Sequence, residues 1–320
     1  MAAQAKEEGS PTTDTTSSAY DEAAAISSES QEHAIAALVS KLPTRQGWLQ
    51  SLVLYNNYWI NPLVVKSIMR LHTTFKPRRD DITLASNPKC GTTWMKALAF
   101  TITNRSRYEL GNNHPLLSHH PQELVPSIEM PRDTNNNLKY LETLPSPRLL
   151  ATHMPLSLLP QSSSIVASGR RVVYVCREPN DTFVSWWHFA NKLGGKEHST
   201  SDLESTLNMF IQGFSPYGPF WEHCLEYWRQ SITNPNSVLF LKYEDMMSEP
   251  VKHVIRLASF LGVPFSTKEE DDGVPEEVVR LCSFEKLSGL RINQAGEIIR
   301  FDDIVFDKSA SSEKGWWGIG

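Results

Sequence analysis

Residues 81–100 read DITLASNPKCGTTWMKALAF, and this stretch decides the fold class of the chain. The apolar run over 82–85 predicts a buried strand, Asn87-Pro88 predicts a turn, and the apolar residues that follow have helical spacing. The first backbone N–H groups of a helix have no partner inside the helix, and the helix dipole favours negative charge at that end. Lys89 adds a positive charge. The stretch therefore predicts a loop that binds a phosphate or a similar anion.

This loop differs from the P-loop of nucleotide-binding proteins. That motif is Gly, four residues, then Gly-Lys-Ser/Thr, whereas here Lys89 precedes Gly91. The hydroxyls of Thr92 and Thr93 add two donors after the glycine. An ordinary strand-to-helix turn capped by threonine accounts for the same residues, so the anion site depends on evidence elsewhere in the chain.

Composition narrows the classes of protein to consider. A chain of 320 residues suits one large domain or two small ones. Its net charge of -5 is not the basic charge that attracts nucleic acid. No apolar run reaches the roughly 18 residues that cross a bilayer. Four cysteines without CxxC spacing predict free thiols in a reducing compartment rather than a zinc ribbon or a secreted disulfide scaffold.

The first 35 residues are rich in Ala, Ser, Thr and Glu. They lack the apolar core of a secretory signal and the arginines of a transit peptide. We therefore expect a disordered N-terminal tail over 1–35 and a cytoplasmic protein.

The remaining segments predict a parallel sheet. Strand-like runs occur in RLLATHMP (148–155), RRVVYVCR (170–177) and VLFLKYED (238–245). Helical patterns separate or follow them, from Pro179, over 205–230 with a break at SPYGP, over 250–261 and over 274–281. Apolar strands that alternate with helices are typical of an α/β domain whose central parallel sheet is flanked by helices.

Two further segments carry weaker predictions. Aromatic and apolar residues at helical spacing predict a helix over 47–75, broken near Pro62. Residues 107–147 are rich in Pro, Asn and His and predict a long functional loop, such as a substrate lid.

Lys89, His153, Arg177 and Tyr243 each follow an apolar run. Ligands of parallel sheets bind beyond the carboxyl ends of the strands, which is where these residues are expected.

A neutral imidazole at His153 can accept a proton from a hydroxyl group. A structural buried histidine explains the same position. The ten histidines show no metal-ligand spacing with an acid, so we predict no metal site.

Arg177 can hold a phosphate with two parallel hydrogen bonds, and Ser185 in the following helix can donate to the same oxygens. The alternatives are an ion pair at the end of the strand for Arg177 and a surface position for Ser185. A serine hydrolase is disfavoured because the chain has no Gly-x-Ser-x-Gly. A nucleotide kinase is disfavoured by the glycine spacing of the loop and by the lack of a clear magnesium-binding acid.

In combination these motifs resemble those of the soluble sulfotransferases. NPKCGTTW is similar to their phosphosulfate loop, usually YPKSGTTW, and RLLATHMPLSLLP to the segment of their catalytic histidine. VVYVCREPNDTFVSWWHF is similar to their 3′-phosphate segment, and FSPYGPFWEHCLEYW and VLFLKYEDM to two further blocks. The forms are most like the plant cytosolic branch, and the resemblance runs from about Trp48 to Asn293.

The resemblance implies a single α/β sulfotransferase domain over 36–306, with a P-loop-like loop that binds phosphosulfate. Its members transfer a sulfuryl group from 3′-phosphoadenosine 5′-phosphosulfate (PAPS), a co-substrate, to a hydroxyl of a small molecule. By resemblance, Lys89 stabilises the leaving phosphate, Arg177 and Ser185 bind the 3′-phosphate, and His153 is the general base. The residues assigned to PAPS in this way are Lys89, Cys90, Gly91, Thr92, Thr93, Trp94, Arg177, Ser185, Tyr243, Cys282, Ser283 and Phe284.

The sequence departs from the family in two places. Cys90 replaces the usual serine of the loop, and a helix N-terminus with a neighbouring lysine lowers thiol pKa values, which predicts an oxidation-sensitive thiol. Near the C-terminus, Asp307-Lys308-Ser309 stands where the family has Arg-Lys-Gly. We therefore expect a divergent, truncated tail over 307–320 and a weakened clamp on the 3′-phosphate.

This departure leaves two functions open: an active sulfotransferase with a rebuilt clamp, or a non-catalytic relative that binds hydroxylated ligands. The expected acceptor is a flavonoid, steroid, phenolic or hormone. Its pocket is expected between the aromatic residues of 47–75, the 107–147 loop and residues 186–188. The family's distal dimerisation segment does not occur, which predicts a monomer.

Overall fold

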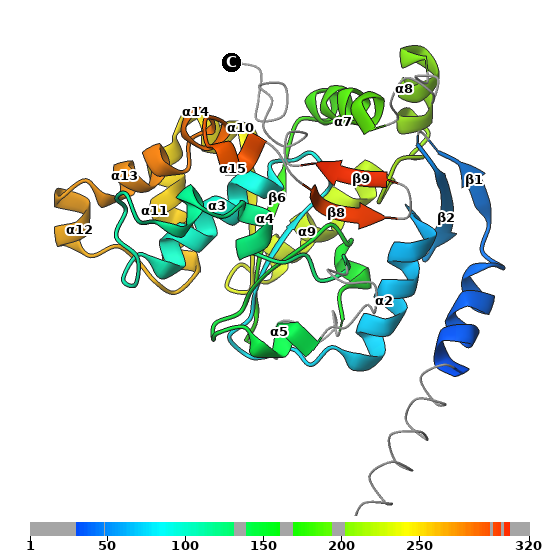
Figure 1. Cartoon of the computed structure of the whole chain (residues 1–320), viewed down its shortest axis with the longest axis horizontal. Coiled ribbons are helices and arrows are strands. Elements are labelled where there is room, and N and C mark those ends of the chain that lie inside the picture. Colours follow the sequence, from blue (N-terminus) through cyan, green and yellow to red (C-terminus); the bar gives the residue numbers. More distant parts are fainter. Residues whose placement is uncertain are drawn as a thin grey trace, which may run out of the picture. The chain divides into compact units, whose positions relative to one another are not determined.

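The computed structural model describes residues 30–47, 49–130, 139–160, 169–193, 202–294, 297–301 and 304–307 (Figure 1). The chain divides into two units, Met1–Leu42 and Pro43–Gly320. The described part of the first unit contains a helix over 30–39, which takes in the last residues of the predicted tail. The rest of that tail, Trp48 and the predicted C-terminal segment from residue 308 lie outside the described residues.

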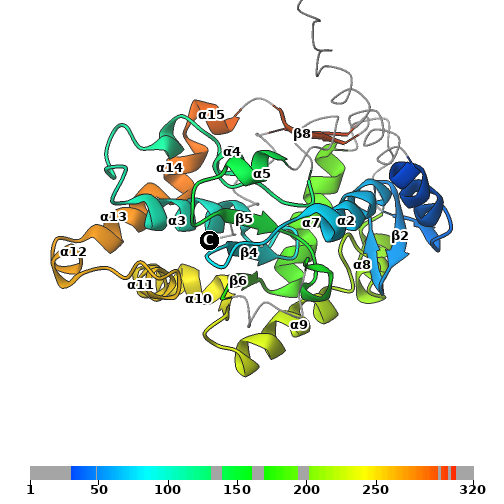
Figure 2. The same cartoon turned by 90° about the horizontal axis from the view of Figure 1, so that it is seen from below.

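The second unit is built around a four-stranded sheet (Figure 2). Its strands are β4 (Ile82–Ser86), β5 (Leu149–Thr152), β6 (Arg171–Cys176) and β7 (Val238–Lys242). Their order is β5-β4-β6-β7, and every pair is parallel. This confirms the predicted parallel sheet and brings the carboxyl ends of all four strands to one edge.

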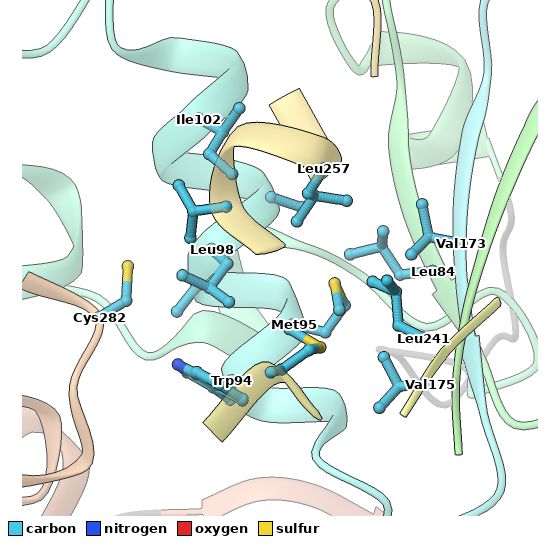
Figure 3. Close-up of a cluster of buried hydrophobic side chains, with 14 of the residues drawn as sticks. Leu84, Trp94, Met95, Leu98, Ile102, Val173, Val175, Leu241, Leu257 and Cys282 are labelled. Carbon is cyan, nitrogen blue, oxygen red and sulfur yellow. The ribbon is translucent and has the colours of Figure 1, made fainter. Parts of the chain in front are cut away.

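Successive side chains of a strand point to opposite faces of a sheet. The buried strands of this sheet therefore present side chains on both faces, and helices cover both. Val173 and Val175 of β6 belong to a core cluster with Leu98 of α3 (Thr92–Asn104) and Leu257 of α11 (Pro250–Phe260) (Figure 3). Tyr174, between the two valines, stacks instead on Tyr227 of α9 (Phe220–Thr233), with ring centroids 4.2 Å apart.

The helix predicted over 47–75 is wrong in its first half. Residues 44–60 form an antiparallel three-stranded sheet of β1 (Thr44–Gln46), β2 (Ser51–Tyr55) and β3 (Tyr58–Ile60). Asn56 and Asn57 connect β2 and β3 at φ values of 46° and 69°, a left-handed pair typical of a tight hairpin turn. The second half is helical as expected: α2 (Pro62–Thr74) begins at Asn61, whose side chain accepts from two backbone N–H groups.

The other predicted helices are confirmed. They are α7 (Pro179–Leu193), α8 (Leu203–Ile211), α9, α11 and α13 (Val274–Leu281), with the SPYGP break between α8 and α9. The 107–147 segment contains short helices as well as loop: η1 (Pro115–Leu117), α4 (Pro121–Leu124) and α5 (Lys139–Thr143).

The remaining elements are η2 (Leu156–Leu158), α10 (Tyr243–Ser248), α12 (Thr267–Asp271), α14 (Phe284–Ser288), α15 (Arg291–Gln294) and a hairpin of β8 (Glu297–Phe301) and β9 (Ile304–Asp307). β9 contacts α7 (Figure 1). Within the described ranges, no helix combines the length and the apolar character that a membrane crossing requires.

Candidate active site at the carboxyl ends of the parallel strands

The predicted anion loop joins β4 to α3 and has a left-handed backbone. Lys89 has a φ of 71°, and Gly91, which precedes the first residue of α3, has a φ of 98°. A Cβ atom on Gly91 would lie 2.8 Å from Cδ2 of Tyr243. Glycine is therefore required here both by the backbone conformation and by space. Because glycine has no side chain, it cannot cap the N–H groups at the start of α3, which leaves them to an anion.

The two threonines of the loop already have protein partners. The hydroxyl oxygens of Thr92 and Ser86 are 2.5 Å apart, which ties the start of α3 to the end of β4. The side-chain amide of Gln122 donates to Thr93 Oγ1 over 3.3 Å. Each hydroxyl keeps further hydrogen-bonding capacity, so both remain candidates for contact with an anion. The sequence did not identify Ser86, because its role depends on this contact between two elements.

Arg177 and Ser185 carry buried polar atoms that have no hydrogen-bond partner among the described residues. Both residues are 2% exposed, and the unpartnered atoms are Nε and Nη1 of Arg177 and Oγ of Ser185. Asp181 lies one helical turn before Ser185 on α7, and its Oδ2 is 3.6 Å from Arg177 Nη2. Ser185 is therefore not the surface serine of the alternative interpretation. Since burying such groups unpaired costs free energy, their presence indicates a site for a polar ligand.

Two cations meet next to the loop. Burial of the Lys89 ammonium group, and then the charge of Arg177, hold the pKa of Lys89 well below its usual value. Lys89 Nζ lies 4.7 Å from the centre of the Phe189 ring, and Arg177 Cζ lies 5.0 Å from the centre of the Tyr243 ring. A bound anion would relieve the repulsion between the two cations, so the electrostatics favour a negatively charged ligand.

His153 follows β5 with its ring fixed in one tautomer. Its Nδ1 is 2.9 Å from the carbonyl oxygen of Ser86. A carbonyl only accepts, so Nδ1 carries the proton and Nε2 keeps its lone pair. Burial lowers the pKa of His153 to about 3, which keeps the ring neutral near pH 7. The residue can therefore accept a proton at Nε2.

Two residues that the sequence did not identify hold the backbone of His153. Glu129 Oε1 accepts from the His153 N–H over 2.6 Å, and His223 Nε2 donates to the His153 carbonyl over 2.9 Å. His223 Nδ1 then accepts from the hydroxyl of Tyr174, also over 2.9 Å. Burial lowers the pKa of His223 to about 4, and burial raises the pKa of Glu129. The network ties the end of β5 to the 107–147 segment, to α9 and to β6.

Five further residues that the resemblance assigns to PAPS lie in different surroundings. Trp94 and Tyr243 are both buried, with ring centroids 5.5 Å apart. Cys282 lies in the core beside α3, where its Sγ is 3.4 Å from Thr101 Oγ1 (Figure 3). Ser283 caps α14 by accepting from the Lys286 N–H, and Phe284 packs on the same core. The roles of these five residues stay predictions.

The expected reactivity of Cys90 is wrong. Its side chain is fully buried, and this burial raises its pKa to about 12. Its Sγ lies 3.6 Å from Thr182 Oγ1. Desolvation of a thiolate here outweighs the favourable effects of the helix N-terminus and the neighbouring cations.

Comparison with known proteins identifies the family. Residues 79–315 match the family model described as the sulfotransferase domain. The chain belongs to the sulfotransferase family. Like other members, this sulfotransferase transfers a sulfuryl group from PAPS to a hydroxyl of a small-molecule acceptor, so the predicted activity and co-substrate are confirmed.

The relatives place the sulfotransferase with plant enzymes. It is 39% identical over 267 residues to cytosolic sulfotransferase 15 of Arabidopsis thaliana, covering 82% of this chain and 74% of that protein. It is 42% identical over 266 residues to cytosolic sulfotransferase 1 of the same plant, covering 81% and 80%. A crystal structure of an Arabidopsis thaliana sulphotransferase that is proposed to act on steroids superposes with a TM-score of 0.66 at 38% identity, covering 79% of this chain and 85% of that protein. The resemblance to the plant cytosolic branch is thereby confirmed.

Proposed function

We propose that the site at the ends of β4, β5 and β6 carries out sulfuryl transfer with a division of roles. Lys89 and the start of α3 bind the 5′-phosphosulfate of PAPS, Arg177 and Ser185 bind its 3′-phosphate, and His153 is the general base. The observation that carries the proposal is the set of buried, unpartnered atoms on Arg177 and Ser185 at the strand edge that also holds a neutral His153.

The 5′-phosphosulfate requires a positive charge beside its leaving oxygen. The stabilisation by this charge increases as the leaving oxygen becomes negative. Lys89 supplies this charge next to the uncapped start of α3. Because the pKa of Lys89 is low in the protein alone, a bound anion raises this pKa and favours the ammonium form. Sulfuryl transfer resembles phosphoryl transfer, in which positioning and charge stabilisation supply most of the catalysis.

The 3′-phosphate supplies the acceptors that Arg177 and Ser185 lack. The Nε–H and Nη1–H groups of Arg177 have no partner among the described residues, and each can donate a charge-assisted hydrogen bond to an anion. Asp181 is half exposed and 3.6 Å from Nη2, which makes it a weak competitor for the same cation.

His153 Nε2 accepts the proton of the acceptor hydroxyl as the new S–O bond forms. The bond from sulfur to the bridging oxygen breaks in the same step, and the electrons stay on the phosphate oxygen beside Lys89. The hydrogen bonds of Nδ1 to Ser86 and of the backbone N–H to Glu129 fix the direction of this lone pair. General-base help of this kind contributes typically about 10²- to 10⁴-fold in rate.

The acceptor belongs to the flavonoid, steroid, phenolic or hormone classes. Aromatic residues near His153 support an apolar ring system: the Tyr217 ring centroid lies 5.7 Å from that of His153. The Tyr217 N–H donates to the Trp59 carbonyl over 2.7 Å, so the aromatic segment of β3 adjoins the base. The steroid sulphotransferase description of one relative also supports an acceptor of this kind.

The expectation of a non-catalytic binding protein rested on the C-terminus, and membership of the sulfotransferase family favours the enzyme. β9 ends at Asp307 beside α7. Asp307 is the first of the three residues that stand in place of the family's clamp, and the other two, Lys308 and Ser309, lie outside the described residues. A cytoplasmic location agrees with the names of the curated relatives, and the monomeric state stays a prediction.

A transfer assay with radiolabelled PAPS tests this proposal. Each acceptor class is offered to the wild-type protein and to His153→Asn, whose amide can keep a donor near Ser86 but provides no base. Transfer that is lost in the variant supports the assignment, whereas equal transfer removes His153 as the base. Tight binding of 3′-phosphoadenosine 5′-phosphate (PAP) without transfer to any of these classes contradicts the proposed acceptor classes.

A further inference from the structure

Three of the four cysteines gather behind the anion loop. Cys90 lies in a buried cluster with Phe183, Phe210 and Phe220, and Cys176, Trp187, Leu207 and Cys224 pack against it. Cys176 is the last residue of β6, directly before Arg177, and Cys224 lies in the first half of α9. The cluster thus joins the strand end of the proposed 3′-phosphate site to the helix that holds His153.

The sulfur atoms of Cys176 and Cys224 are 3.6 Å apart, which is hydrogen-bonding distance for two thiols. Both side chains are partly exposed, whereas Cys90 and Cys282 are fully buried. A disulfide requires an S–S distance of about 2.05 Å, so the two sulfurs have to move closer by roughly 1.5 Å. A shift of this size is within reach of side-chain rotation and a small movement of the helix.

The two thiols differ in acidity. A hydrogen bond from the Cys224 thiol lowers the pKa of Cys176, with a smaller contribution from Lys242, while burial, Glu244 and Glu178 oppose the shift. The same hydrogen bond raises the pKa of Cys224. Cys176 is therefore the nucleophile of the pair, and Cys224 is placed to react with it second.

We propose that Cys176 and Cys224 form a reversible disulfide when the protein meets a peroxide. The Cys176 thiolate attacks one oxygen of hydrogen peroxide, the O–O bond breaks, and the departing hydroxide takes up a proton to become water. The Cys176 sulfenic acid that results is attacked by the Cys224 sulfur. The S–S bond forms, the S–O bond breaks, and the oxygen leaves as water with the Cys224 proton. Two electrons pass from the two thiols to the peroxide.

The position of this disulfide connects it to the proposed site. Drawing the end of β6 toward α9 displaces Arg177, the next residue in the chain, and α9 also carries His223, which donates to the His153 carbonyl. We expect oxidation to weaken the binding of PAP, a consequence that rests on the proposed function of Arg177.

Peptide mapping of the full chain tests the proposal. The reduced protein is treated with hydrogen peroxide at a small molar excess, blocked with an alkylating agent and digested without reductant. The expected product is the Cys176 peptide joined to the Cys224 peptide, and dithiothreitol should separate them. In Cys224→Ser, Cys176 should instead be trapped as sulfenic acid by dimedone.

Cys90→Ser is the matched control. Serine is the usual residue of the family's phosphosulfate loop at this position, and the variant removes the third thiol of the cluster. It should form the same cross-link as the wild type. A Cys90–Cys176 cross-link, or peroxide treatment that leaves Cys176 and Cys224 unjoined, would overturn the proposal. The mapping does not depend on PAP: a disulfide in a protein that does not bind PAP supports this site and contradicts only the proposed function.

Discussion

The imidazole Nδ1 of His153 donates to the carbonyl oxygen of Ser86 over 2.9 Å. This bond joins the residue after β5 to the last residue of β4, two neighbouring strands of the parallel sheet. It places the ring at the strand edge where the anion loop begins and leaves Nε2 as the acceptor atom. The position and the tautomer of the proposed base are therefore consequences of strand pairing.

Replacing His153 by Asn should separate catalysis from binding. The variant loses the base but keeps a short polar side chain beside Ser86, so turnover should fall by about 10²-fold or more. Calorimetry should find the affinity for PAP little changed. His33→Asn, an exposed histidine in the helix over 30–39, is the control and should behave as the wild type. A variant of His153 with near-normal turnover contradicts the base assignment.

Replacing Arg177 by Gln should weaken PAP binding selectively. Charge-assisted hydrogen bonds contribute about 1.5–3 kcal/mol, which corresponds to roughly a 10- to 100-fold loss of affinity. Adenosine 5′-phosphate lacks the 3′-phosphate, so its affinity should change much less. The control is Arg280→Gln, an exposed arginine that pairs with Glu277 on α13. Equal losses for both nucleotides would place the 3′-phosphate elsewhere.

Replacing Gly91 by Ala should destabilise the anion loop. The backbone has a φ of 98° there, and the added methyl group would lie 2.8 Å from Tyr243 Cδ2. Strain of this kind costs about 1–3 kcal/mol in the free energy of unfolding, which urea denaturation measures. At Gly111, a Cβ atom meets nothing within 4 Å, so Gly111→Ala is the control. Equal stability of the two variants would show that the loop tolerates a side chain.

His223 should make folding sensitive to acid. Its pKa is about 4 in the folded protein and 6.5 ordinarily, so between these values the unfolded chain binds more protons. The stability that His223 contributes is complete above pH 6.5 and is lost as the pH falls toward about 4. His153, with a pKa of about 3, acts in the same direction.

Urea denaturation at several pH values checks this prediction. His223→Gln can keep a donor to the His153 carbonyl without a titrating group, so its free energy of unfolding should fall less steeply from pH 6.5 to pH 4. His33→Asn is again the control and should follow the wild type. A slope in His223→Gln that equals the wild-type slope would contradict the assignment.

The sequence predicted the parts of this fold that local patterns encode. The apolar runs gave all four strands of the parallel sheet, and the residues after them gave Lys89, His153, Arg177 and Tyr243 at its carboxyl edge. The hairpin over 51–60 was missed because its aromatic residues also fit helical spacing, while the Asn56-Asn57 turn decides the structure.

Contacts between distant segments could not be predicted from the sequence. Glu129 and His223 hold the backbone of His153 from segments that showed no catalytic motif. Cys90 was expected to be acidic because the helix start and Lys89 are visible in sequence, whereas the complete burial that raises its pKa is not. Desolvation depends on packing by α7, α8 and α9, which only the folded chain brings together.

A calorimetric titration of the wild-type protein with PAP at neutral pH tests the proposed nucleotide site. Our expectation is saturable binding at one site per chain, with an affinity that falls in Arg177→Gln and is retained in His153→Asn. The absence of measurable binding to the folded wild-type protein would contradict it.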